Sequence, residues 1–190
     1  MGIPLRKIPQ TRSNRDAMRH LYLLRHAKSD PGNLGMSDHS RPLNARGQQA
    51  AERMGAYLQA QGISPQAVLV STSKRTRETL DQLHFSPLPA IISAMDELYL
   101  ADPQKILEVL RGLSGEIGSV MVIGHNPGMH EVAAFLAQIG AVNAQPALER
   151  LSHGFPTSAL AEFEIAGNWD ELAPDCAKLV RLTVPADLPH

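Results

Sequence analysis

The sequence predicts an α/β fold: a single domain with a doubly wound, mostly parallel sheet and helices on both faces. Short apolar runs of strand length alternate along the chain with segments of helical hydrophobic spacing, which is typical of such a sheet. No repeat, low-complexity tract or linker divides the chain, and 190 residues are most simply one domain with a substantial core. We expect this domain to cover residues 20–190.

The apolar runs define the strands. The first, Leu21-Tyr22-Leu23-Leu24, ends at a turn-like segment and predicts a buried strand over residues 20–25. By the same reasoning, further strands are predicted at residues 67–70, around 91–92, and at 119–124, 159–165 and 177–184.

Capping signals define the helices between these strands. Asn44 is a good N-cap for a helix that runs to about residue 61 and stops at Gly62. Its Ala51, Met54 and Leu58 recur at helical spacing and are expected to face the core. Asp102-Pro103 opens a helix to about residue 113, and Asn126-Pro127 is expected to open another to about residue 139 by the same device. Shorter helices are predicted at residues 73–83 and near 146–152.

Composition excludes several classes of function. Hydrophobic residues make up 43% of the chain and charged residues 19%, with a formal net charge of -1, so nucleic acid and anionic membranes are not expected partners. No apolar stretch approaches the ~20 residues of a membrane span, and the first residues do not contain the apolar core of a secretory signal, so export is not expected. Cys176 is the one cysteine, which favours a reducing, cytoplasmic location.

Residues 1–19 differ in character from the rest of the chain. They are basic and polar, and Pro4 and Pro9 would interrupt any helix. This pattern predicts a flexible basic arm ahead of the domain.

Two predicted strands each end in a histidine. Arg25-His26 follows the first apolar run, and Gly124-His125-Asn126 follows the run Val120-Met121-Val122-Ile123. Open α/β sheets bind ligands at the carboxyl ends of their strands, so both histidines are expected at one edge. Nearby basic residues could hold an anion there: Arg25, Lys28, Arg41, Arg46, Arg75 and Arg77.

These residues suit phosphoryl chemistry on an imidazole. Guanidinium groups stabilise the charge on a phosphoryl group in transfer, and Arg75 follows the strand at 67–70. Nearby positive charge also favours a neutral, nucleophilic imidazole. The backbone N–H groups of Asn126, Gly128 and Met129, at the start of a predicted helix, are expected to add an anion site.

Four segments resemble the histidine phosphatase (phosphoglycerate mutase-like) superfamily, and in particular its SixA-like phosphohistidine phosphatases. They are Leu23-Leu24-Arg25-His26-Ala27, Arg41-Pro42-Leu43-Asn44-x-x-Gly47, Arg75-Thr76-Arg77-Glu78-Thr79 and Gly124-His125-Asn126-Pro127. Their order and placement at strand ends are more specific than any one of them alone. Ala27 departs from the family's usual glycine.

The resemblance implies a role for each matched residue. His26 would be the phospho-accepting nucleophile, and Arg25, Arg75 and His125 would hold the phosphoryl group. Arg41 would line the pocket. Independently of the resemblance, Asn126 is expected to bind phosphate, and Lys28 could attract an anionic substrate or be an ordinary loop lysine. Larger members of the family use a carboxylate as general acid, and Glu97, in Asp96-Glu97-Leu98-Tyr99, is the candidate here.

Several of these residues also have plain structural interpretations. Arg75 could lie on a helix surface paired with Glu78 or Glu52, and Arg77 is expected on such a surface. The loop 152–157, which contains His153, could line the pocket. His130-Glu131 begins like a zinc-protease helix, but Ala134 stands where the second histidine is needed, so neither metal nor cofactor is predicted.

The combined reading is a metal-independent phosphatase with a phosphohistidine intermediate on His26. Its expected substrate is phosphohistidine on a partner protein, because 190 residues leave little length for the loops that enclose a sugar phosphate in mutases. Two alternatives stay open. One is a phosphomonoesterase or mutase acting on small phosphate esters through the same site, and the other is a non-catalytic module that binds phosphoproteins.

Overall fold

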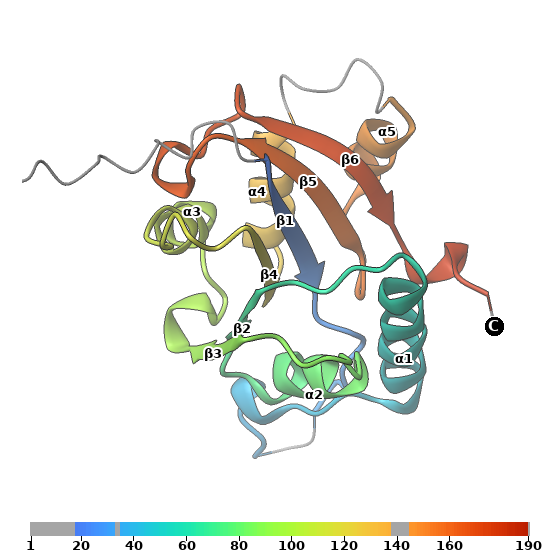
Figure 1. Cartoon of the computed structure of the whole chain (residues 1–190). Helices are drawn as coiled ribbons and strands as arrows, with labels where there is room; N and C mark the ends of the chain where they lie inside the picture. Colours follow the sequence, from blue (N-terminus) through green and yellow to red (C-terminus); the bar gives the residue numbers. More distant parts are fainter. Residues whose placement is uncertain (1–17, 33–34, 138–144, 190) are drawn as a thin grey trace, which may run out of the picture.

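The computed structural model describes residues 18–32, 35–137 and 145–189. Six strands form one sheet in the order β3-β2-β4-β1-β5-β6 (Figure 1). Among these described strands, β5 is antiparallel to both of its neighbours and the other five all run in one direction, so the prediction of a mostly parallel sheet is confirmed. The strands are β1 (Met18–Arg25), β2 (Ala67–Ser71), β3 (Ile91–Met95), β4 (Ser119–Gly124), β5 (Leu160–Ala166) and β6 (Ala177–Thr183).

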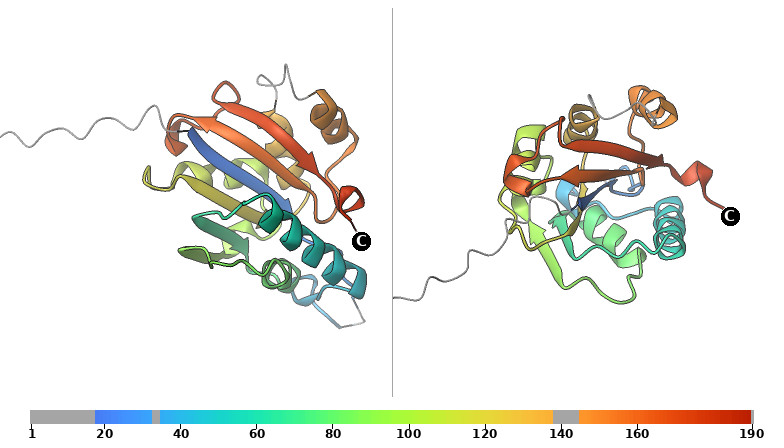
Figure 2. Two further views of the ribbon diagram at one scale, coloured as in Figure 1. Left: turned by 45° about the vertical axis from the view of Figure 1, so that its right-hand side comes forward. Right: turned by 45° about the horizontal axis from the view of Figure 1, so that its top comes forward.

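Helices cover both faces of the sheet, as a doubly wound fold requires. The helices α1 (Ala45–Ala60) and α2 (Lys74–Gln82) lie against one face. The helices α3 (Pro103–Arg111), α4 (Gly128–Leu136) and α5 (Gln145–His153) lie against the other (Figure 2). The alternation of side chains along β1 supplies both layers. Leu21 and Leu23 pack with α3 and α4, whereas Leu24 packs with α1 and α2.

The start of α1 is as predicted, and it holds the loop that follows β1. The Asn44 side chain accepts a hydrogen bond from the Gly47 amide at 2.9 Å. A Cβ atom at Gly47 would lie 2.0 Å from the Lys28 carbonyl oxygen, so only glycine allows this close approach. Ala51, Met54 and Leu58 are buried, as their spacing predicts.

Two expectations about chain segments are wrong. Asn126 does not cap α4, because its side-chain amide donates to the Phe155 carbonyl instead; Pro127 occupies the N-cap position, and α4 ends at Leu136. Met18 and Arg19 belong to β1 rather than to a loose arm. Arg19 is buried and donates to the Gly115 carbonyl at 2.8 Å, which anchors the start of the strand. The rest of the predicted arm lies outside the described residues.

No helix in the described part of the chain is both long and apolar enough to span a membrane.

Candidate active site

The register of the sheet brings the two predicted histidines together. In the parallel pair β1–β4, Arg25 lies opposite Gly124, so the next residue of each strand emerges at the same edge. The His26 amide donates to the Gly124 carbonyl at 3.1 Å, and the His26 and His125 ring centroids lie 5.1 Å apart. The expectation that both histidines meet at one carboxyl edge is confirmed.

These histidines lie in a cavity of about 420 Å³ that opens to solvent, which we call the histidine cavity. Seven of its lining residues were predicted from the sequence: Arg25, His26, Lys28, Arg41, Arg75, His125 and Asn126. Three were not: Ser29, Asp38 and Leu100. The remaining residue, Thr157, belongs to the loop 152–157 that was expected to be able to line the pocket.

His26 is held from both sides of its backbone. The amide of Ala27 donates to the Thr79 hydroxyl at 3.0 Å, which attaches this segment to α2. The Ala27 methyl group is fully buried against Leu43 and Ala51, so alanine fills a space that glycine would leave empty. His26 itself is 8% exposed on the floor of the cavity.

One hydrogen bond sets the tautomer of His26. Its Nδ1 lies 2.7 Å from the Ala27 carbonyl oxygen, which can only accept, so Nδ1 carries the proton. The neutral ring therefore has its lone pair on Nε2. No described residue forms a hydrogen bond to that nitrogen.

Electrostatics keep this ring neutral. Burial is the largest cause that lowers the pKa of His26, and the positive charges of Arg75, Arg25 and Arg41 act in the same direction. Against the opposing effect of the Ala27 carbonyl, they bring this pKa to about 4. Arginines therefore do favour the neutral form, as the sequence predicts, but desolvation is the larger cause. At neutral pH the Nε2 lone pair is available.

His125 is held differently. Its Nδ1 accepts from the Arg75 guanidinium at 3.3 Å, since arginine can only donate. Its Nε2 then carries the proton and donates to the Ser71 hydroxyl at 2.8 Å. Burial first, and then the neighbouring His26 ring and the charge of Arg75, lower the pKa of His125 to about 3. Ser71 ends β2, so a third strand end contributes to the site.

Arg75 is a cavity residue and does not lie on the helix surface. It is 3% exposed in the first turn of α2, and it donates to the Asp38 carboxylate at 2.9 Å and to the Asp38 backbone carbonyl at 2.6 Å. The alternative pairing with Glu78 or Glu52 is wrong. Arg77, two residues further on, is exposed as predicted.

Asp38 is the main residue that sequence reasoning missed. Its carboxylate accepts hydrogen bonds from the Tyr99 hydroxyl at 2.7 Å and from Arg41 and Arg75. These contacts, with the Tyr99 bond the largest, hold the pKa of Asp38 well below its usual range. Its position three residues before Arg41, in a polar loop after a strand, is the signal that could have identified it.

Arg41 lines the cavity as the resemblance implies, but it also braces the loop around it. It donates to the Asp30 carbonyl at 2.7 Å and to the Ser29 hydroxyl at 3.0 Å, besides the bond to Asp38 at 2.8 Å. Lys28 is exposed at the rim of the same cavity.

The structure does not bring Glu97 to this site. Glu97 is exposed in a short 3-10 helix, Asp96–Leu98, and is not among the residues that line the cavity. Tyr99 from the same segment reaches Asp38 instead, and its ring lies 5.6 Å from that of His125. The segment was correctly placed near the site, but a different residue of it makes the contact.

Of the backbone N–H groups expected to form an anion site at the start of α4, those of Gly128 and Met129 do not face the histidine cavity. The Met129 amide donates to the His125 carbonyl at 3.0 Å, and Pro127 has no N–H. Gly128 and Met129 are buried and do not line the cavity. A Cβ at Gly128 would lie 2.0 Å from the Ala101 carbonyl oxygen, so this helix start packs against protein instead.

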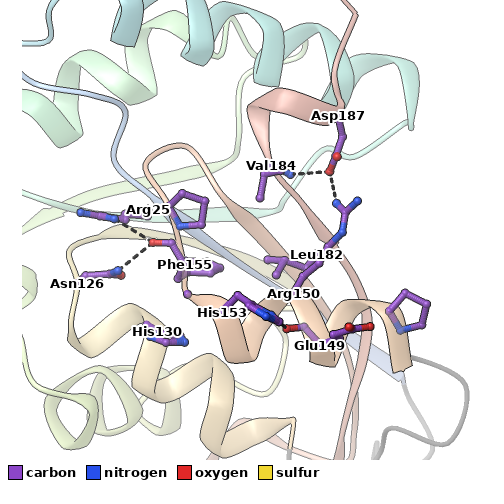
Figure 3. Close-up of a pocket in the computed structure, with 13 residues that line it drawn as sticks. Arg25, Asn126, His130, Glu149, Arg150, His153, Phe155, Leu182, Val184 and Asp187 are labelled. Atoms are coloured by element: carbon purple, nitrogen blue, oxygen red, sulfur yellow. Dashed lines mark hydrogen bonds and ion pairs between the residues drawn. The ribbon is translucent and has the colours of Figure 1, made fainter.

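A second cavity, of about 780 Å³, adjoins the first, and we call it the Phe155 cavity (Figure 3). Arg25 and Asn126 line both cavities, and both donate to the Phe155 carbonyl at 2.9 Å. The loop 152–157 therefore reaches the histidine cavity through Thr157, whereas its His153 lines only the second cavity.

Within residues 18–32, 35–137 and 145–189, no group of three or more His, Cys, Asp or Glu side chains is arranged to hold a metal ion.

Known proteins are similar to this chain in both sequence and fold. The model of the histidine phosphatase superfamily (branch 1) matches residues 21–98. The chain is 37% identical over 162 residues to the uncharacterized protein Rv1276c of Mycobacterium tuberculosis, which corresponds to 85% of this chain and 99% of that protein.

Two solved structures extend the similarity to the whole domain. Both are described as candidate SixA phosphohistidine phosphatases. The one from Nakamurella multipartitia is 28% identical, with a TM-score of 0.77 over 89% of this chain and 97% of that chain. The one from Agrobacterium tumefaciens is also 28% identical, with a TM-score of 0.72 over 88% and 98%. Since sequence, fold and paired histidines agree, this chain belongs to the histidine phosphatase superfamily, in its SixA-like branch.

Proposed function

We propose that this protein is a metal-independent phosphatase that removes the phosphoryl group from phosphohistidine on a partner protein. The proposed nucleophile is His26, and the observation that carries the proposal is the unoccupied lone pair on its Nε2 in a cavity lined by arginines. The SixA-like names of the similar structures support the same substrate class.

Arg25, Arg75 and Arg41 bring three guanidinium groups to the histidine cavity. In phosphoryl transfer the negative charge spreads over the equatorial oxygens, and fixed donors stabilise it without reorganisation. Arg75 is the best fixed of the three, because it is nearly fully buried. His125 is neutral beside it. When a phosphoryl dianion offsets the arginine charge, His125 Nδ1 would take a proton from solvent, give up its hydrogen bond from Arg75 and donate to a phosphoryl oxygen instead.

The reaction occurs in two steps. His26 Nε2 forms a bond to phosphorus while the P–N bond of the substrate breaks, and the substrate imidazole leaves neutral with its proton on the other ring nitrogen. The phosphorylated His26 ring is cationic, and its Nδ1–H bond to the Ala27 carbonyl supports that charge. Water then attacks phosphorus, the P–Nε2 bond breaks, and phosphate leaves with both protons of the water, which returns His26 to its neutral form.

In the described part of the chain, the histidine cavity contains no carboxyl group suited to act as a general acid, and this favours phosphohistidine over phosphate esters as the substrate. Asp38 is the one Asp or Glu among the described residues that line the histidine cavity, and its lowered pKa makes it a poor proton donor. An alcohol needs a general acid to leave from phosphorus, whereas imidazole leaves readily once its other nitrogen is protonated. Glu97, the predicted acid, is not positioned to help.

Phosphate release in excess chelator tests this proposal. The substrate is an isolated phosphotransfer domain phosphorylated on histidine, compared with sugar phosphates and with the His26→Ala variant. We expect release by the wild type alone, and a far higher kcat/KM for the phosphohistidine domain. Faster hydrolysis of sugar phosphates would favour the phosphomonoesterase, and binding without turnover would favour the phosphoprotein-binding module.

A further inference from the structure

The Phe155 cavity is the largest feature next to the histidines that the chemistry above does not use. It lies between α4, α5 and the end of β6 (Figure 3). Its floor is apolar, with Phe155, Leu182 and Val184, and its rim is polar and carries both charges, with Glu149, Arg150, His153 and Asp187.

One loop separates the two cavities and faces both. Thr157 lines the histidine cavity, whereas Phe155 and Pro156 line the second one. Gly154 begins the loop with φ +133, a conformation that glycine adopts readily, and Arg25 and Asn126 fix the Phe155 carbonyl. A substrate whose phosphoryl group reaches His26 therefore extends naturally over this loop.

The charges of the Phe155 cavity decide what kind of group fits there. Arg150 is paired with Asp187, so its charge is already neutralised. The Glu149 carboxylate forms no ion pair or hydrogen bond with a described residue. An anionic small molecule gains little from such a rim, whereas a basic side chain above an apolar one complements it.

We propose that the Phe155 cavity binds the segment of the partner protein next to the phosphohistidine, with an apolar side chain on its floor and a basic side chain at Glu149. This inference rests on the proposed function and adds to it the recognition site for the substrate. Most of the binding energy would come from the buried apolar anchor, and Glu149 would select the charge.

Three substrates test the inference with the intact protein. The first is a phosphohistidine peptide with leucine and lysine on both sides, the second has alanine and glutamate at those positions, and the third is free phosphohistidine. We expect the wild type to prefer the first peptide over the second by about tenfold or more in kcat/KM.

Two variants locate the preference in the cavity. Val184→Phe fills the cavity and should remove the preference while leaving free phosphohistidine hydrolysis unchanged. The matched control is Val180→Phe, because Val180 is an exposed valine on β6 that does not line the cavity. Glu149→Lys, at an exposed position, should reverse the charge preference, and Glu116→Lys is its control at a distant exposed site.

Equal kcat/KM values of the wild type for the two peptides would overturn the inference. So would a Val184→Phe variant that loses as much kcat/KM on free phosphohistidine as on the first peptide. Because free phosphohistidine uses the histidine cavity alone, its hydrolysis separates the two proposals. If the wild type hydrolyses none of the three substrates, the proposed function fails and the recognition site fails with it.

Discussion

The ends of β1 and β4 lie side by side and each delivers a histidine, but the two rings are held in opposite ways. The Nδ1–H of His26 donates a hydrogen bond to the Ala27 carbonyl, and its Nε2 lone pair is available to attack phosphorus. His125 has both nitrogens engaged, one with Arg75 and one with Ser71. Both rings are buried and neutral, so the hydrogen bonds, and not the pKa values, distinguish the nucleophile from the supporting group.

The largest effect should follow from removing the nucleophile at the end of β1. We expect His26→Ala to lose on the order of 10⁶-fold in kcat, as when a nucleophile is removed from other covalent enzymes. Trapping of labelled phosphoenzyme checks this, because the wild type should carry label and the variant none. His20→Ala, at the exposed opposite end of β1, is the control. Label on His125 in His26→Ala would reverse the assignment.

Removing the ring at the end of β4 should cost less. His125→Ala deletes one group that can donate to the phosphoryl oxygens, so we expect a loss of about 10²- to 10³-fold in kcat. Labelled phosphoenzyme should still form on His26. Loss of all labelling in a folded His125→Ala protein would show that the two strand ends have equal roles.

Arg75 joins the two strand ends, since it contacts His125 and lines the cavity with His26. We expect Arg75→Ala to cost about 3 kcal/mol of transition-state stabilisation, or about a hundredfold in kcat/KM. Arg77→Ala is the matched control on the same helix, because Arg77 is exposed. Equal rates for the two variants would contradict a role for Arg75 in the transition state.

Removing the charge of Asp38 should have a smaller effect than these losses, and it should strengthen anion binding. Its carboxylate competes with a phosphoryl group for Arg75 and Arg41. Asp38→Asn should therefore tighten inhibition by inorganic phosphate by about 5- to 10-fold, on the order of 1 kcal/mol for an exposed charge. Inhibition constants at low and high salt measure it. Weaker inhibition would mean that Asp38 chiefly positions the arginines.

The smallest effect is a shift in titration. The reactive form of His26 is neutral, so kcat/KM should hold as pH falls below the ordinary histidine value and decline only near pH 4. Arg75→Gln removes a positive charge that disfavours the imidazolium, so the pKa of both His26 and His125 should rise. Burial is the larger cause in both, so neither pKa should reach about 6.5. Ring-proton NMR titration measures this, and an unchanged pKa would assign the shifts to burial alone.

Apolar runs and caps were enough to predict most elements, because each depends on neighbours in sequence. The α4 start shows the limit. Asn126-Pro127 has the same local signal as Asp102-Pro103, but a distant carbonyl at Phe155 takes the Asn126 side chain, whereas Asp102 caps α3 through the Lys105 amide. Capping predicted from neighbouring residues fails where the side chain forms a long-range hydrogen bond instead.

The sequence by itself determined the strands and helices, the order of the motifs and the edge at which Arg25, His26, Arg75 and His125 meet, since parallel strands bring their carboxyl ends together. Only the tertiary structure decided the tautomers of the two histidines, the position of Asp38 beside the arginines and the Phe155 cavity. Those features depend on contacts between residues far apart in the chain, and the pattern of any one segment does not encode them.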